Sequence, residues 1–518
     1  MKCIDINDGW LFTRVSTGEC ETVTLPHDAI INTDRNPDQH NYFLLAGFEG
    51  GQFLYEKTLT LPEGKTCVLE LEACYCMTKV YVNDHLAVDH PYGFTPIQIE
   101  LNPFLRDDAK AAIRVEVNIP KDGHGRWYTG GGIYRPVHLY VGDDPYIDLY
   151  GLKVTTLSHD PAVIRVDVSS HGGDLLKLEL LWQGKPVLSA ETVVTEGKAS
   201  VELTVPGARL WSAEQPNLYE LRAALCKEGK VCDNVTETFG IRTIELKPEQ
   251  GLFINGVRTF LRGGCIHNDN GVIGVINNDA TELHRAKNLK RTGFNALRSA
   301  HHPMSRSLMK ACDEVGLYVM DEAFDYWYRL KGGNPHTQRF LDTFEADTAL
   351  MVQDAYNHPC VVMYSIGNEI PEAGSRKGVR VGKRIVDVIH SLDTSRPTTL
   401  CPSVHWLREY LEGTCYLDTD EDEWLALSDE NKKADWQHYV KIFMGAVLNL
   451  PDNEKGMTYP PTYIRADEDA TKNLYPYLDV AGYNYLTAKV SNLVYKMERS
   501  TMDFIDIVLS EPAGEEKE

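Results

Sequence analysis

Two glutamates, Glu369 and Glu511, each follow a short apolar stretch that has the length of a buried strand. Residues 361–366 run into Gly367-Asn368-Glu369, a turn that carries a carboxylate, and residues 504–509 run into Ser510-Glu511. In a parallel α/β barrel the catalytic groups lie at the carboxyl ends of the strands. The two carboxylates are therefore candidates for one site. Each string alone also fits a simpler alternative: a surface Glu after a buried strand, or an acidic tail that contains Glu511.

The segment after residue 244 has the pattern of such a barrel. Short apolar strands alternate with helical segments of 3.6-residue period, which predicts a parallel sheet with right-handed crossovers. Polar residues follow the strands, among them His267, His301 and Asp321. Strands are expected at 259–263, 296–298, 318–321, 361–365, 398–400, 478–481 and 504–509, and helices at 281–291, 305–315, 339–356 and 380–392.

The expected fourth and seventh strands end at Glu369 and Glu511, on opposite sides of the barrel mouth. Two carboxylates that face each other across a sugar-sized opening suit the cleavage of a glycosidic bond with retention of configuration. One carboxylate is the nucleophile that forms a glycosyl-enzyme. The other protonates the leaving oxygen and then activates water.

The part of the chain before the barrel predicts β-structure. In residues 1–143, short alternating strands separated by turn residues predict an all-β sandwich. Residues 144–244 alternate in the same way, and their length is that of an immunoglobulin-like sandwich. The domains expected are thus 1–143, 144–244 and 245–518. The clearest strands are at 52–59, 79–83, 112–117, 163–168, 177–182 and 199–205.

The amino-acid composition limits the kinds of binding partner to be expected. The 518 residues carry a formal net charge of −23, which argues against nucleic acid or an anionic membrane because phosphate would be repelled. No apolar run approaches the ~20 residues that span a bilayer, and the first residues lack the pattern of a signal peptide. The scattered cysteines fit free thiols in a reducing cytoplasm. They include one C-x-C pair but no second pair at metal-ligand spacing, so no zinc site is expected.

Several sequence motifs together resemble those of a known enzyme family. Asn357-His358-Pro359 followed by Ser365-Ile366-Gly367-Asn368-Glu369 is similar to the acid/base motif of glycoside hydrolase family 2, the family of β-galactosidases and β-glucuronidases. The resemblance covers essentially the whole chain and implies a jelly-roll domain, an immunoglobulin-like domain and a (β/α)8 TIM barrel. The other motifs are Leu25-Pro26-His27-Asp28, the stretch 126–135, Phe239-Gly240-Ile241-Arg242, and Asn295 to Pro303, which resembles the family pattern Asn-x-x-Arg-x-x-His-x-Pro.

The resemblance also implies roles for single residues. Glu369 matches the acid/base, Glu511 the nucleophile, and Asn368 the residue that binds the sugar 2-hydroxyl. Further residues match the walls of the sugar subsite or lie in motifs beside it, with either tyrosine of the 483–485 stretch as the partner of the nucleophile. These expected substrate-binding residues are His267, Arg298, His301, Tyr483, Tyr485, Asp321 and Trp327.

The chain departs from the family pattern at two points, one that concerns metal binding and one that concerns the completeness of the barrel. The Glu-x-His pair with which some family members bind Mg²⁺ is absent, and Tyr326 stands where its Glu would be, so no metal or other cofactor is expected. Family members continue past the nucleophile with an eighth strand. We therefore expect a barrel that lacks its last strand and helices, either in a truncated chain or in one whose open edge a partner or a second copy covers.

Single positions and one short stretch of the sequence indicate which sugar is expected as the substrate. Gly367 stands where a β-mannosidase of the family would carry Asn, and the stretch 443–449 before Asp479 is more similar to family β-galactosidases. The leading expectation is a retaining exo-β-glycosidase that hydrolyses terminal β-D-galactosides. A β-glucuronidase and an inactive carbohydrate-binding remnant are the alternatives.

Overall fold

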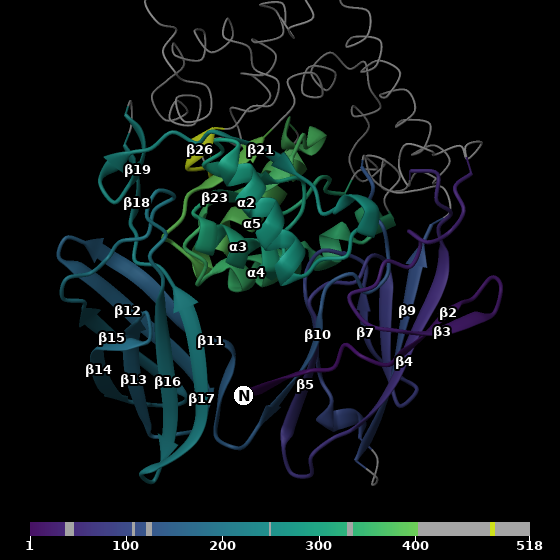
Figure 1. The fold of residues 1–518 in the computed structure, drawn as a ribbon, viewed down its shortest axis with the longest axis horizontal. Coiled ribbons are helices and arrows are strands. Elements are labelled where there is room, and N and C mark those ends of the chain that lie inside the picture. The colour runs from purple at the N-terminus through teal and green to yellow at the C-terminus, as the bar shows by residue number, and fades with distance from the viewer. Residues whose placement is uncertain are drawn as a thin grey trace, which may run out of the picture.

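The computed structural model describes residues 1–36, 46–105, 109–120, 127–247, 250–328, 335–374, 376–401 and 477–481. These residues form two β-sandwiches and one α/β part (Figure 1). In the view of Figure 1 the sandwiches stand side by side, and the α/β part lies across one end of both. The N-terminus lies between the two sandwiches.

The first sandwich consists of two antiparallel sheets. One has the strand order β1-β10-β5-β8 and the other β3-β2-β4-β9-β6-β7. Inward-facing side chains such as Phe53, Leu69 and Val115 alternate with exposed ones and form a core of their own. The sandwich is confirmed, while its jelly-roll topology stays a prediction. The strands are β1 (Lys2–Asp5), β2 (Trp10–Arg14), β3 (Glu19–Val23), β4 (Gly51–Thr60), β5 (Thr66–Leu71), β6 (Thr78–Val82), β7 (His85–His90), β8 (Ile97–Glu100), β9 (Lys110–Ile119) and β10 (Val137–Gly142), with one 3-10 turn, η1 (Asn102–Phe104).

The second sandwich also consists of two antiparallel sheets, but it is smaller. Its sheets have the orders β11-β12-β15 and β14-β13-β16-β17, all antiparallel. Side chains of period two, such as Ile164, Val166 and Val168 on β12, face its core. The strands are β11 (Tyr146–His159), β12 (Ala162–His171), β13 (Leu175–Trp182), β14 (Lys185–Val193), β15 (Lys198–Thr204), β16 (Tyr219–Lys227) and β17 (Lys230–Phe239).

The α/β part is built on six parallel strands whose order in the sheet is their order in the chain. A small antiparallel sheet, β18-β19-β20, precedes it. Within the described residues these six strands do not close into a barrel, and the seventh strand expected at 504–509 lies outside them. The strands are β18 (Ile244–Lys247), β19 (Gly251–Ile254), β20 (Val257–Arg258), β21 (Gly263–Ile266), β22 (Ala296–Ser299), β23 (Tyr318–Glu322), β24 (Val361–Asn368), β25 (Thr398–Cys401) and β26 (Val480–Ala481).

Four helices connect the strands, close to where the periodicity predicts them. Asn278 and Ser305 accept backbone N–H bonds at the first turns of two of them, as N-cap residues do. Gly316 ends the second of these at φ 81°, a conformation that glycine adopts without steric cost. The helices are α2 (Asp279–Arg291), α3 (Arg306–Val315), α4 (Phe340–Ala355) and α5 (Arg376–Leu392), with the 3-10 turns η2 (Gly271–Ile273), η3 (Pro335–Gln338) and η4 (Pro371–Gly374). No helix in the described part of the chain has the length and apolar character needed to cross a membrane.

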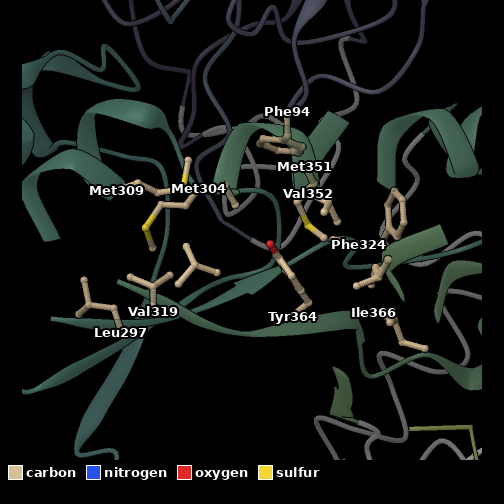
Figure 2. Close-up of a cluster of buried hydrophobic side chains, with 14 of the residues drawn as sticks. Phe94, Leu297, Met304, Met309, Val319, Phe324, Met351, Val352, Tyr364 and Ile366 are labelled. Atoms are coloured by element: carbon tan, nitrogen blue, oxygen red, sulfur yellow. The ribbon is translucent and has the colours of Figure 1, made fainter. Parts of the chain in front are cut away.

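The parallel strands bury both faces. On one face Leu297, Val319 and Tyr364 pack against Met309 of α3 and Met351 of α4 (Figure 2). On the other face a smaller cluster gathers Met320, Met363, Cys401 and Val480, with Leu246 of β18 packed against it. Side chains of β22, β23 and β24 thus alternate between a helix side and an interior side. The interior side is where polar residues at the strand ends can meet.

Two buried arginines tie the sandwiches to the α/β part. Arg135 of the first sandwich donates to the carbonyls of Phe94 and Pro303 at 3.2 and 2.9 Å. Arg242, which follows the second sandwich, donates to the carbonyls of Pro359 and Val361 at 3.0 and 2.9 Å, at the start of β24. Both side chains are almost completely buried. The sequence motifs that contain them therefore position the strands that carry the candidate site.

One expected strand was misplaced. The segment 259–263 was predicted as the first strand of the parallel sheet, but β21 begins at Gly263, where 259–263 was expected to end. A Cβ on Gly263 would lie 2.0 Å from the carbonyl oxygen of Ala296, so the neighbouring strand approaches more closely than a side chain allows. The Gly263-Gly264 pair marks this close approach and not the end of a strand.

Candidate active site

A cluster of polar side chains lies at the carboxyl ends of β22, β23 and β24, on the interior side of the sheet. Arg298 is the next-to-last residue of β22, Glu322 ends β23, and Asn368 ends β24. The alternation of side chains along a strand explains why these residues face the interior. Met320 and Met363 face the interior, so Glu322 and Ser365, two positions further on, face it too.

Glu322 is the centre of the cluster. Its carboxylate is fully buried and accepts hydrogen bonds from Arg298 at 2.8 Å, from the Ser365 hydroxyl at 2.6 Å and from His301 Nδ1 at 2.6 Å. Burial by itself raises the pKa of this carboxyl, but the Arg298 charge and the His301 and Ser365 bonds outweigh it and lower the pKa to about 2. Glu322 is therefore ionised at neutral pH and fixes the orientation of Arg298 and His301.

Asn368 connects this cluster to the turn that carries Glu369. Its side-chain oxygen accepts a bond from Arg298 at 2.9 Å, and its amide donates to Asp325 at 2.8 Å. Its backbone N–H donates to the carbonyl of Phe324 at 2.8 Å. The side-chain amide is thus oriented by a cation on one side and a carboxylate on the other.

Glu369 lies directly beyond the end of β24. It is 2% exposed, its backbone has φ 50°, and its N–H donates to the carbonyl of Cys401 on β25 at 2.7 Å. A side chain in place of Gly367 would force its neighbour to move, because a Cβ there would lie 2.6 Å from Cγ1 of Ile370. The turn is therefore tight and firmly bound, and it holds a carboxylate beside the polar cluster. Burial raises the pKa of the neighbouring Cys265 thiol, and the charges of Glu322 and Glu369 act in the same direction.

Two histidines and a tryptophan lie beside the cluster. His267 follows β21, and its Nδ1 bonds the carbonyl of Ala300. The ring of Trp127 stacks on His267 at a centroid distance of 4.5 Å and meets the edge of His301 at 5.7 Å. Trp127 comes from the first sandwich, and its indole N–H donates to Asn268 at 3.2 Å. The site is thus built by two domains.

Both histidines are neutral at neutral pH. Burial lowers the pKa of His267 and of His301, and the bond to Glu322 opposes this effect at His301 without reversing it. Each ring uses Nδ1–H as a donor, to Ala300 and Glu322 respectively, which leaves Nε2 as an acceptor. Two acceptors close to a buried carboxylate are suited to bind hydroxyl groups.

Two predicted site residues lie apart from this cluster. Asp321 is on the helix side of β23, where it accepts the backbone N–H of Met304 at 2.8 Å, and burial raises its pKa to about 7. Trp327 is fully buried among apolar residues, and its indole donates to the carbonyl of Ile366 at 3.2 Å. Both side chains therefore contact the backbone near the strands and not the polar cluster. Glu511, Tyr483 and Tyr485 lie outside the described residues.

The structure adds residues that the sequence analysis did not assign. Glu322, Asp325, Ser365 and Trp127 all take part in the arrangement. Glu322 and Asp325 belong to the stretch 321–327, in which only Asp321 and Trp327 are expected from the sequence to bind substrate. Within the described part of the chain, no group of three His, Cys, Asp or Glu side chains has a geometry that could hold a metal ion.

Comparisons with known proteins bear on the same residues. Residues 244–438 match the model described as "Glycosyl hydrolases family 2, TIM barrel domain", and residues 146–242 match the model "Glycosyl hydrolases family 2". The chain belongs to glycoside hydrolase family 2. The family confirms the resemblance seen in the motifs, and the first match contains the whole described cluster except Trp127.

Relatives and solved structures agree with this family. The chain is 32% identical to a β-galactosidase, BoGH2A, of Bacteroides ovatus over 68% of this chain and 43% of the relative. It is 30% identical to a putative β-glucuronidase of Formosa agariphila over 65% of this chain and 33% of that protein. A crystal structure of a family 2 member from Bacteroides cellulosilyticus superposes with a TM-score of 0.75 at 28% identity, covering 93% of this chain and 59% of that one. The chain spans about half the length of the curated relatives it matches.

Proposed function

We propose that this chain carries the sugar subsite and the acid/base residue of a retaining exo-β-glycosidase that acts on terminal β-D-galactosides. The single observation that supports this most is the position of Glu369. It is a buried acidic residue in a tight turn at the carboxyl end of β24, directly after Asn368, whose side chain accepts a hydrogen bond from Arg298 of the Arg298–Glu322 pair. A carboxyl group in such a place can exchange a proton with a bound sugar while water is largely excluded.

The proposed reaction has two steps. In the first, Glu369 gives its proton to the glycosidic oxygen while a second carboxylate attacks the anomeric carbon, which breaks the glycosidic bond and forms a glycosyl-enzyme. We assign the second carboxylate to Glu511. In the second step Glu369 takes a proton from water and the water oxygen attacks the anomeric carbon. The bond from that carbon to Glu511 breaks, which restores the Glu511 carboxylate, and the free sugar leaves with retained configuration.

The remaining residues of the cluster would bind and orient the sugar. Neutral His267 and His301 each offer Nε2 as an acceptor for a sugar hydroxyl, and Trp127 closes the subsite with an apolar ring. Arg298 orients the Asn368 amide, which we assign to the 2-hydroxyl. A hydrogen bond at this hydroxyl that strengthens in the transition state contributes to the rate.

The test compares 4-nitrophenyl β-D-galactoside with the corresponding β-D-glucuronide, using the purified chain and a Glu369→Gln variant as the control. We expect faster hydrolysis of the galactoside, loss of the activity in the variant, and the β-anomer as the first product in proton NMR. Release of the α-anomer would contradict a retaining mechanism. No hydrolysis of either compound, combined with galactose binding in calorimetry, would favour a carbohydrate-binding protein instead.

A β-glucuronidase is the second candidate, because relatives named β-glucuronidase match the chain over as much of its length as those named β-galactosidase. It uses the same two carboxylates and differs in how the sugar C6 group is recognised. Faster hydrolysis of the glucuronide in the same assay would establish it and overturn the galactoside proposal.

A further inference from the structure

One buried carboxylate of the first sandwich makes contact with the α/β part beside the candidate site. Asp28, which follows β3, is 1% exposed. Its Oδ1 accepts the backbone N–H groups of Ile30 and Ile31 at 3.1 and 3.3 Å, which closes a local turn. Its Oδ2 accepts the Tyr128 hydroxyl at 2.9 Å and the backbone N–H of Val275 at 3.0 Å. One oxygen therefore serves the local turn, and the other joins two segments that are far apart in the sequence.

Both of these segments have a glycine where they approach the carboxylate. A Cβ on Gly130 would lie 2.8 Å from Oδ2 of Asp28, and a Cβ on Gly274 would lie 2.1 Å from the same atom. The two glycines have φ values of 57° and 68°, which glycine adopts without steric cost. The segments also contact each other, because a Cβ on Gly130 would lie 2.3 Å from Cγ2 of Val275. Backbone from both domains therefore converges on one oxygen of Asp28.

Each segment also carries part of the candidate site. Trp127 stacks on His267 at a centroid distance of 4.5 Å and donates to Asn268 at 3.2 Å. It directly precedes the tyrosine that bonds Asp28. The loop 267–275 is therefore joined to the first sandwich at both ends, by Trp127 at its start and by Asp28 at its end.

The loop is bound to helix α2 independently of this carboxylate. Asn270 and Asn277 both donate to the buried Glu282 carboxylate at 2.6 Å. These bonds keep the loop on the α/β part, whereas Asp28 determines where the loop lies relative to Trp127. Loss of the Asp28 bond should therefore displace the loop from Trp127 without unfolding it.

We propose that Asp28 is a positioning residue that holds Trp127 and the loop 267–275 together as one wall of the sugar subsite. This inference rests on the proposed function, since the sugar is what the wall would contact. Asp28 acts through Trp127 and His267, which bind the sugar, and not through the proton donor Glu369. Its removal should therefore weaken substrate binding more than it slows the chemical steps.

An Asp28→Asn variant separates the two roles of the carboxylate. The amide keeps an oxygen for the local turn, but its NH2 group takes the place of Oδ2 and faces the N–H of Val275. The Tyr128 hydroxyl can reverse and accept a bond from this group, whereas a backbone N–H only donates. The opposite orientation of the amide would face two donors, Ile30 and Ile31, with a third and is less favourable. The variant therefore keeps the turn and loses the bond between the domains.

An Asp233→Asn variant is the matched control. Asp233 on β17 also accepts a backbone N–H, that of Ile147 at 2.9 Å, and it pairs with the amino group of Met1. These partners belong to the two sandwiches and not to the α/β part. The control therefore loses a comparable carboxylate contact at another place in the molecule.

Hydrogen exchange followed by mass spectrometry tests the contact without substrate. In Asp28→Asn we expect the amide of Val275, in the peptide 269–276, to exchange at least about tenfold faster, because a buried N–H has lost its acceptor. The peptide 146–150 should be unchanged. In Asp233→Asn the reverse is expected. Unchanged exchange of 269–276 in Asp28→Asn, or the same increase there in both variants, would overturn the proposal.

Steady-state kinetics on the glycoside that the wild type cleaves better tests the positioning role. We expect KM to rise about fivefold in Asp28→Asn with kcat within about twofold of the wild type, and both to stay unchanged in Asp233→Asn. A double variant with Trp127→Ala should stay below about tenfold in KM, whereas independent effects of about fivefold each would multiply to about 25-fold. Effects that multiply, or a loss in kcat alone, would overturn the positioning role.

The two measurements separate this inference from the proposed function. The expected exchange result, combined with no hydrolysis and no galactose binding by the wild type, would overturn the proposed function and still support the contact between the domains. Tyr128→Phe is the variant to use if Asp28→Asn does not fold, because it removes one bond and keeps the bond to Val275. It should raise KM about twofold without a change in kcat, and an unchanged KM would overturn the positioning role.

Discussion

Replacing Glu322 by Gln should destabilise the α/β part by an amount that the structure lets us estimate. The fully buried carboxyl has a pKa of about 2, against 4.5 for an ordinary Glu. The difference between these two pKa values, at about 1.4 kcal/mol per pH unit, gives about 3–4 kcal/mol of stability at neutral pH. Removing one partner of a buried ion pair costs about 3–5 kcal/mol in general, which agrees with this figure.

The sign of the pH dependence follows from the direction of the shift. Because the pKa of Glu322 is lower in the folded state, its contribution is complete above pH 4.5 and is lost as the pH falls toward 2. The difference between wild type and Glu322→Gln should therefore shrink in that acidic range. Urea unfolding at pH 7 is the assay, and with a slope of about 1–3 kcal/mol/M the midpoint should fall by at least about 1 M.

Asp321 provides the matched control, because it is the neighbouring acid on the same strand with the opposite shift. Burial raises its pKa to about 7, so its ionisation destabilises the fold as the pH rises from 3.8 through 7. Asp321→Asn should therefore cost little at pH 8 or be stabilising. A loss below about 1 kcal/mol for Glu322→Gln, or equal losses for both variants at pH 8, would refute the reasoning.

Other variants test the turn and the subsite wall. Gly367→Ala should cost about 1–3 kcal/mol and reduce activity, because its new Cβ would lie 2.6 Å from Ile370 Cγ1. Thermal unfolding measures this loss, and Gly264→Ala, with nothing within 4 Å of its Cβ, should be nearly neutral. Trp127→Ala should raise KM for the aryl glycoside about fivefold with a smaller change in kcat, since it removes about 1 kcal/mol of ring contact to His267. A change in kcat alone would contradict this role.

Much of the fold could be predicted from periodicity. Between residues 279 and 401, the expected helices and strands lie near their observed limits, because amphipathic helices and apolar strands have different periods. Ser305, for example, begins α3 as an N-cap, which its residue type indicates. The first parallel strand was misplaced: it was expected at 259–263, whereas β21 runs from Gly263 to Ile266. Only the packed sheet shows that Gly263 is required by the approach of Ala296.

The site was harder to predict for two physical reasons. A parallel strand is apolar on both faces, so the local string does not say whether Asp321 or Glu322 points to the interior. Asp321 is the residue that the sequence predicts to bind substrate, whereas the polar cluster is built around Glu322. Trp127 was missed as a site residue because it is 141 positions away from its partner Asn268, and no local pattern reports such a contact.

The most direct test of the central claim is the dependence of the Glu369→Ala variant on the leaving group. A 2,4-dinitrophenolate leaves without protonation, whereas a methyl or unsubstituted phenyl aglycone needs a proton from the acid. We predict that kcat/KM falls by about 10²–10⁴ on the poor leaving groups and by far less on the dinitrophenyl glycoside. An equal loss on good and poor leaving groups would contradict the role of Glu369 as the acid, and with it the proposed function.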